Sequence, residues 1–158
     1  MKKFLICLIL CGTATFSFAQ KQLLSYEDVK YILHNNLQIA DSFLVAKGYT
    51  LVKKDIKANN RKYALNMPGG SHNNIAVRSD GKRLFMEIET NELKQYNLIH
   101  ESITPYLLKD VVADDMQAYA IKELGNIYIT VNDTAPYNPL TRLYDIQIVS
   151  DRRITAYN

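Results

Sequence analysis

The amino-acid sequence predicts an α+β domain in which an antiparallel β-sheet of about six to seven strands carries two helices packed on one face. Two features lead to this prediction. Two segments have the 3.6-residue apolar spacing of amphipathic helices, and the other segments alternate apolar and polar residues between turn signals. The order is a helix, about four strands, a helix and about three strands. Two α-then-β units are an alternative description, although the halves show no convincing sequence repeat.

The first twenty residues, MKKFLICLILCGTATFSFAQ, have the pattern of a secretory signal peptide. Two lysines precede an apolar run that is too short to span a membrane. Small residues stand three and one positions before Gln20, which predicts cleavage after Ala19. A lipobox around Cys11 is the alternative, but lipoboxes carry a small residue before the cysteine, and here that residue is Leu10. We therefore expect an exported protein, periplasmic or extracellular.

Removal of residues 1–19 leaves 158 minus 19, or 139 residues, which suits a single α+β domain at 20–158. Both cysteines, Cys7 and Cys11, lie in the removed segment, so the mature domain would have no disulfide and depend on its core. Two of the 19 Lys and Arg residues also leave, and the remaining 17 against 16 Asp and Glu give a net charge of +1. This balance gives no reason to expect a nucleic-acid partner.

Residues 25–47 are predicted to form the first helix, because both of its ends are marked. Ser25 is a typical N-cap, Asp28 stands three residues later, and Gly48 follows the end. The apolar residues keep helical spacing, which predicts one buried stripe. The stripe consists of Val29, Ile32, Leu33, Leu37, Ala40, Phe43 and Leu44.

Strands are predicted for residues 49–56 and 62–67, and the clearest hairpin signal follows at 74–90. There the pair Asp80-Gly81 is flanked by alternating apolar residues, which favours a two-residue turn. This turn places the apolar residues of both strands on the face that would receive the first helix. The predicted pairs are Val77 with Leu84 and Ile75 with Met86.

Residues 90–106 are predicted to form the second helix, with Thr90 or Asn91 as the N-cap and an end near Pro105. Its inner face would consist of Leu93, Tyr96, Ile99 and Ile103.

Another hairpin is predicted at 116–133, with a three-residue loop at 124–126. That loop would pair Ile121 with Ile129 and Tyr119 with Val131. The last strand, at 142–150, would place Tyr144, Ile146 and Ile148 on one face.

The stretch LNMPGGSHNNI at 65–75 combines two glycines with Ser71 and His72, which raises the question of a nucleophile and an oxyanion hole. The spacing argues against this chemistry. The serine-hydrolase elbow is G-x-S-x-G on a strand-to-helix turn, and an immediately adjacent histidine is poorly placed as the base. Pro-Gly and Asn suit a connection between two strands. We interpret the stretch as a turn, with ligand or partner contact as the alternative.

Metal and cofactor sites are not predicted. His34, His72 and His100 lack the spacing of a ligand pair, and the acidic run 110–115 lacks the glycine and terminal glutamate of an EF-hand loop. The sequence therefore predicts no metal site, no cofactor and no catalytic residue set.

The polar face of the first predicted hairpin is the best candidate for a contact surface. The predicted register sets Arg78 against Arg83, and like charges repel unless an acidic group lies between them. We expect a binding module, inhibitor-like or immunity-like, whose partner is a protein or small ligand. The candidate contact residues are Arg78, Arg83, Phe85, His72, Asn73, Tyr137 and Asn138. The alternative is a small hydrolase that uses a carboxylate pair such as Glu87 and Glu89, which share a strand face.

Overall fold

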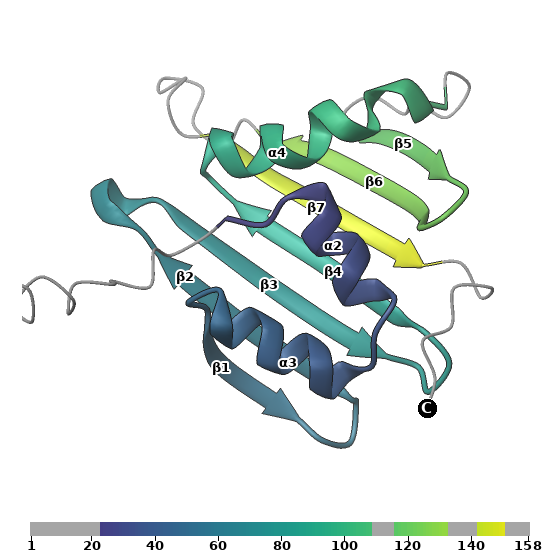
Figure 1. The fold of residues 1–158 in the computed structure, drawn as a ribbon. Helices are drawn as coiled ribbons and strands as arrows, with labels where there is room; N and C mark the ends of the chain where they lie inside the picture. Colours follow the sequence, from purple (N-terminus) through teal and green to yellow (C-terminus); the bar gives the residue numbers. More distant parts are fainter. Residues whose placement is uncertain (1–22, 109–115, 133–141, 151–158) are drawn as a thin grey trace, which may run out of the picture.

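The structure, a computed structural model, describes residues 23–108, 116–132 and 142–150. In these residues seven strands form one antiparallel sheet (Figure 1). The strand order is β1-β2-β3-β4-β7-β6-β5, so the last strand of the chain lies beside β4 at the centre. The strands are β1 (Thr50–Asp55), β2 (Asn60–Asn66), β3 (His72–Ser79), β4 (Leu84–Thr90), β5 (Met116–Ile121), β6 (Gly125–Asn132) and β7 (Leu143–Ser150).

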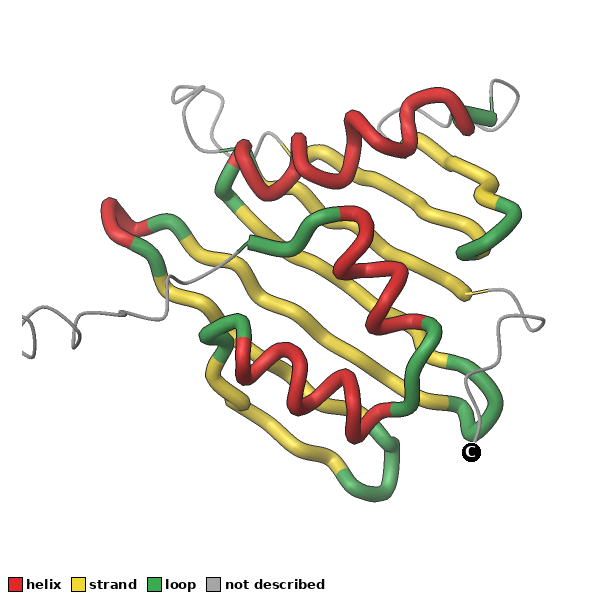
Figure 2. The backbone as a smooth tube through the Cα atoms, in the orientation of Figure 1, coloured by secondary structure: helices red, strands yellow, loops and turns green. Residues whose placement is uncertain are grey.

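The helices of the described residues lie together on one face of this sheet (Figure 2). They are α2 (Tyr26–Leu33), α3 (Leu37–Ala46) and α4 (Leu93–Ile103). Contacts join α2 and α4 to β4, and α3 to β1 and β3. Two short 3₁₀ helices, η1 (Pro68–Gly70) and η2 (Thr104–Tyr106), follow β2 and α4. This arrangement confirms the predicted α+β fold with an antiparallel sheet.

The first predicted helix is not continuous, because the polar sequence His34-Asn35-Asn36 breaks it into α2 and α3. The Asn35 side chain donates to the carbonyl of Tyr31 at 2.7 Å, beyond the last residue of α2. The side chain of Asn36 accepts the backbone N–H groups of Gln38 and Ile39 at 3.0 Å, so it is the N-cap of α3. The prediction of a single helix at 25–47 was wrong at this point.

The outer ends of the α2–α3 pair follow the prediction. Ser25 and Asp28 form a capping box: Ser25 Oγ accepts the Asp28 N–H at 3.2 Å, and Asp28 Oδ2 accepts the Ser25 N–H at 2.8 Å. Gly48, directly beyond the C-cap of α3, has a φ of 91°, which glycine adopts without strain.

The β3–β4 hairpin turns one residue later than predicted. Ser79 pairs with Leu84, and Val77 pairs with Met86 instead of Leu84. The carboxylate of Asp80 accepts the N–H groups of Lys82 and Arg83 at 2.9 Å, which centres the reversal on residues 81–82. The register therefore slips by two residues, and an even slip keeps every side chain on its predicted face.

On the polar face, the same slip changes the neighbours. Arg78 lies opposite Phe85, and Ala76 lies opposite Glu87. The predicted pairing of Arg78 with Arg83 was therefore wrong.

The β5–β6 hairpin also differs in register from the prediction. Its loop is formed by residues 122–124, so that Ile121 pairs with Gly125 and Tyr119 with Ile127. Leu124 is fully buried, which pulls the loop onto the core, and Gly125 takes a φ of 117°. The shift is again even, so the predicted inward residues of β5 and β6 stay inward.

Helix α4 differs from the prediction at its first turn. Its N-cap is Glu92, whose side chain accepts the Lys94 N–H at 3.3 Å, and Leu93 is 53% exposed. Gln95 is fully buried instead. The predicted inner positions Ile99 and Ile103 are confirmed.

The core lies between the helices and the sheet. Tyr144, Ile146 and Ile148 of β7 all point into it, as the alternation of that strand predicted. Ile146 and Ile148 belong to one core cluster with Ile75, Val77, Leu84, Met86 and Ile88 of other strands and Val29, Ile32, Leu44 and Ile99 of the helices. Within the described ranges, no helix is long and apolar enough to cross a membrane.

Candidate functional site

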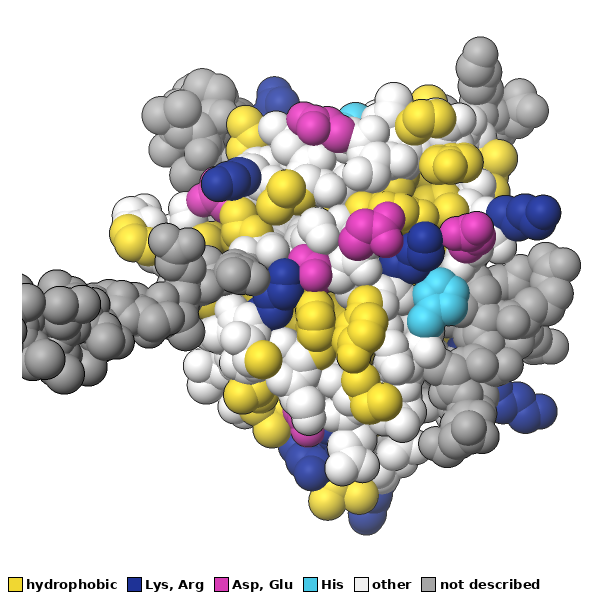
Figure 3. Space-filling model, in the orientation of Figure 1, with side chains coloured by type: hydrophobic (Ala, Val, Ile, Leu, Met, Phe, Trp, Pro, Cys, Tyr) yellow, Lys and Arg dark blue, Asp and Glu magenta, His cyan; other side chains and the backbone are white. Residues whose placement is uncertain are grey.

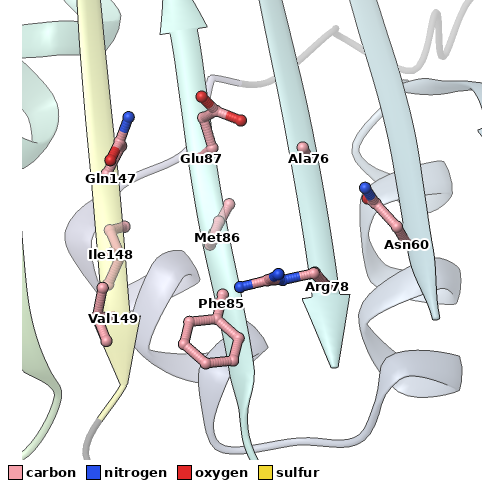
Figure 4. A pocket seen from close by; sticks show the side chains of 9 residues that line it. All are labelled: Asn60, Ala76, Arg78, Phe85, Met86, Glu87, Gln147, Ile148 and Val149. Atoms are coloured by element: carbon pink, nitrogen blue, oxygen red, sulfur yellow. The ribbon is translucent and has the colours of Figure 1, made fainter. Parts of the chain in front are cut away.

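The face of the sheet opposite the helices is uncovered in the part of the chain that the structure describes (Figures 1 and 4). Because alternate residues of a strand point to opposite sides, the register fixes which side chains share this face. Its central row crosses all seven strands. The row runs Lys53, Lys62, Ala76, Glu87, Gln147, Tyr128 and Ala118.

Arg78, Phe85 and Arg83, three of the candidate contact residues, lie close together on this face. The guanidinium carbon of Arg78 lies 4.7 Å from the centre of the Phe85 ring, and that of Arg83 lies 4.6 Å from it. Cation–π contacts of this kind hold an arginine against an aromatic ring while its charge stays accessible. Figure 4 shows Arg78 directed along the sheet toward Phe85.

The two arginines are not equivalent. Arg83 is engaged by Asp80, with Nε donating to Oδ2 at 3.0 Å, and its Nη1 donates to the carbonyl of Ser150 at 3.2 Å. Hydrogen bonds from the backbone N–H of Lys82 and from Arg83 lower the pKa of Asp80. Arg78 makes no ion pair with any of the described residues. Arg78 is therefore the arginine that is free to bind another group.

Two shallow depressions, each of about 340 Å³, lie on this face and share Ala76 and Glu87. The first is lined by Arg78, Phe85 and Gln147 among others, as Figure 4 shows. The second lies toward β1 and β2. Its side walls include Val52, Lys62, Ala64, Asn74 and Glu89.

Three carboxylates stand close together on β4 and β7. Glu89 lies directly opposite Asp145, and Glu87 is two residues along β4 on the same face. Burial raises the pKa of Glu87, and Asp145 and Glu89 raise it further, while Lys62 lowers it. Burial and the charge of Glu89 also raise the pKa of Asp145, against a hydrogen bond from Gln147. This part of the face therefore carries negative charge that is incompletely balanced.

His72 and Asn74 lie at the upstream end of β3 on the same face. Asn74 Nδ2 donates to Glu89 Oε1 at 3.2 Å, and His72 Nε2 lies 3.9 Å from that oxygen. The preceding glycines belong to η1, and residues 67–71 join β2 to β3, so the glycine-containing part of the stretch is a connection between strands, as predicted.

Asn73, another candidate contact residue, points into the core instead. It is fully buried, and its Nδ2 donates to Tyr49 Oη at 2.6 Å and to Gln95 Oε1 at 2.8 Å. A side chain in this position supports the fold and does not meet a partner directly. The remaining candidates, Tyr137 and Asn138, lie outside the described residues.

Sequence reasoning missed several residues of the face, namely Asn60, Lys62, Ala76, Asp145 and Gln147. For all of them except Asn60, which lies before the predicted strand at 62–67, the alternation of their strands predicted which way they point. It did not predict that β7 lies next to β4, which brings Asp145 and Gln147 beside Glu87 and Glu89.

Within the described residues, no group of three or more His, Cys, Asp or Glu side chains is placed to hold a metal ion. On the helix side, hydrophobic side chains lie in separate groups among charged ones (Figure 3). Scattered exposed hydrophobic residues are ordinary on a protein surface. Comparison of the chain with protein-family models, curated proteins and solved structures finds no match in any of the three.

Proposed function

We propose that this protein is an exported binding module that contacts its partner through the uncovered face of the sheet, with Arg78 and Phe85 at the contact. Inhibitor-like and immunity-like proteins are the classes that this proposal favours. The partner is a protein or small ligand and not a nucleic acid, because the charge of the chain is nearly balanced.

One observation carries the proposal. Arg78 lies on the ring of Phe85 next to a depression, on a sheet face without a helix in the described residues. An arginine held against an aromatic ring loses little side-chain freedom on binding, and both residue types are enriched where interfaces gain most of their energy. The arrangement therefore suits contact with another molecule.

Co-purification tests this function. The tagged protein is captured from the cell that exports it, beside the variants Arg78→Ala and Lys94→Ala. Lys94 is exposed on α4, on the opposite side of the sheet, and serves as the matched control. We expect wild type and Lys94→Ala to retain the same partner and Arg78→Ala to lose it while keeping its circular dichroism spectrum. Equal retention by all three proteins contradicts the proposal.

A carboxylate-dependent hydrolase is the second candidate, supported by the raised pKa of Glu87 beside Glu89 and Asp145. A carboxyl group that keeps its proton to higher pH serves as a general acid more readily. A broad hydrolase screen decides between the two functions. Activity that disappears in Glu87→Gln supports the enzyme and contradicts the binding module.

A further inference from the structure

We propose that the depression lined by Arg78, Phe85 and Glu87 binds a small zwitterion, a molecule that carries a carboxylate and an ammonium group on a short apolar body. Free apolar amino acids and short peptides of such amino acids have this chemistry. The inference rests on the proposed function, because the zwitterion is the molecule that meets Arg78 and Phe85. It adds which chemical groups the bound molecule must have.

The central observation is that a cation and an anion line one depression without pairing with each other. Arg78 and Glu87 both line the depression of about 340 Å³, and neither forms an ion pair with any of the described residues. Figure 4 shows the guanidinium of Arg78 at one end of the group, beside Phe85, and the carboxylate of Glu87 at the other end. A ligand with one charge binds one of these groups and is repelled by the other, whereas a zwitterion provides a partner for both.

The register of β3 and β4 sets the spacing of the two charged residues. Arg78 lies opposite Phe85, and Glu87 is two residues further along β4 on the same face. Diagonal neighbours of this kind are about 7–8 Å apart, so a short molecule can reach both side chains. Ala76 pairs with Glu87 and precedes Arg78 by two residues, and its methyl group leaves the space between the two charges open.

The apolar body of the ligand would lie against Phe85 and Val149. These residues are direct neighbours on β4 and β7, and both line the depression. The ring of Phe85 lies 4.7 Å from the guanidinium carbon of Arg78, so a carboxylate bound to Arg78 brings the rest of the ligand close to this ring. An apolar side group would therefore be removed from water on binding, and glycine, which has none, should bind more weakly than phenylalanine.

The surroundings of Glu87 favour an ammonium group at the other end. Burial raises the pKa of Glu87, and the charges of Asp145 and Glu89 raise it further, while Lys62 lowers it. Lys62 has this effect without forming an ion pair with Glu87. An ammonium group of the ligand supplies positive charge where these three carboxylates lie together.

Titration of the purified exported protein with four probes, followed by nuclear magnetic resonance, tests this site. L-phenylalanine and the dipeptide glycyl-L-phenylalanine are zwitterions, 3-phenylpropionate lacks the ammonium group, and 2-phenylethylamine lacks the carboxylate. We expect at least one zwitterionic probe to bind with a dissociation constant of about 0.1–1 mM, as is usual for so small a molecule. Each of the two probes with one charge should bind about tenfold more weakly or less.

Two variants assign the charges of the ligand to residues of the protein. Arg78→Gln and Glu87→Gln each remove one charge, and each should weaken binding of the zwitterionic probe by about tenfold or more. Glu87→Gln should also bind 3-phenylpropionate about as well as the zwitterion, because it has lost the partner of the ammonium group. The controls are Lys94→Gln and Glu101→Gln, which change exposed residues of α4 and should bind like wild type. The spectrum of each variant reports whether it is folded.

The inference is overturned if neither zwitterionic probe binds wild type at about 10 mM, well above the expected dissociation constant. It is also overturned if a probe with one charge binds wild type as tightly as the zwitterions, or if Glu87→Gln binds the zwitterions like wild type. These results leave the proposed function in place, because partner capture through Arg78 is a separate measurement. Retention of the captured partner by Arg78→Ala, in contrast, contradicts the proposed function whatever the four probes show.

Discussion

The side chain of Gln95 on α4 holds the backbone of Leu24 by two hydrogen bonds in the core. Its Nε2 donates to the Leu24 carbonyl at 2.7 Å, and its Oε1 accepts the Leu24 N–H at 2.8 Å. The same Oε1 accepts Asn73 Nδ2 at 2.8 Å. One buried amide thus joins the segment before α2, helix α4 and strand β3.

Replacement of Gln95 by Ala should lower the free energy of unfolding by about 1–3 kcal/mol, because buried backbone groups of Leu24 lose their partners. Urea denaturation measures this change. Gln38→Ala is the control, since Gln38 is exposed on α3, and it should change stability by less than about 0.5 kcal/mol. Equal effects of both substitutions would show that the buried contact contributes nothing.

Two leucine-to-alanine substitutions separate the core from the surface. Leu84 is 2% exposed and Leu93 is 53% exposed, although both were predicted to lie inward. Leu84→Ala should cost about 2–5 kcal/mol through lost burial and a cavity, and Leu93→Ala less than about 1 kcal/mol. Thermal and urea unfolding of both variants checks this difference, and a larger cost at Leu93 would reverse the assignment.

The break between α2 and α3 should depend on Asn36. Asn36→Ala removes the side chain that caps α3 and should lower stability by about 1 kcal/mol. Asn36→Ser keeps a capping oxygen and should stay close to wild type. If the Asn36→Ala variant is as stable as the Asn36→Ser variant, the capping side chain does not determine where α3 begins.

Glu87→Gln should stabilise the protein slightly at neutral pH. Burial raises the pKa of Glu87 above its usual 4.5, so the folded state binds this proton more tightly than the unfolded state does. The stabilising contribution of this proton to the free energy of unfolding is therefore complete below the pKa of Glu87 in the unfolded state. It is lost as the pH rises through the pKa of Glu87 in the folded state. Because Glu87 is exposed in part, the gain at pH 7 should be about 0.5 kcal/mol or less. Urea midpoints that favour Glu87→Gln more at pH 7 than at pH 4 support this sign, and the opposite trend contradicts it.

Export should leave a mature chain that begins at Gln20, because small residues precede the predicted cleavage site. Mass spectrometry of the protein from its native cell measures this N-terminus. A lipid-modified Cys11 would show membrane anchoring instead, and an intact Met1 would contradict export.

The sequence by itself determined most of the elements and, in the strands, the inward and outward sides of their residues. Strand alternation placed Ile75, Val77, Met86 and Ile146 in the core, and their burial confirms it. This information is local, because the two-residue period of a strand survives any even slip in register. It was also enough to place Arg78 and Phe85 on the same face.

The tertiary structure decided the register, the neighbours and the buried polar positions. The hydrogen bonds of Asp80 shifted the turn of the β3–β4 hairpin, and the packing of Leu124 against the core shifted the loop of the β5–β6 hairpin. The periodicity of a strand does not describe these contacts. Pairing of β7 with β4 brought Asp145 beside Glu89, although these residues are far apart in the sequence. Asn73 and Gln95 are fully buried and are joined by a hydrogen bond, and a hydrogen bond between distant elements leaves no signal in the apolar spacing of either element.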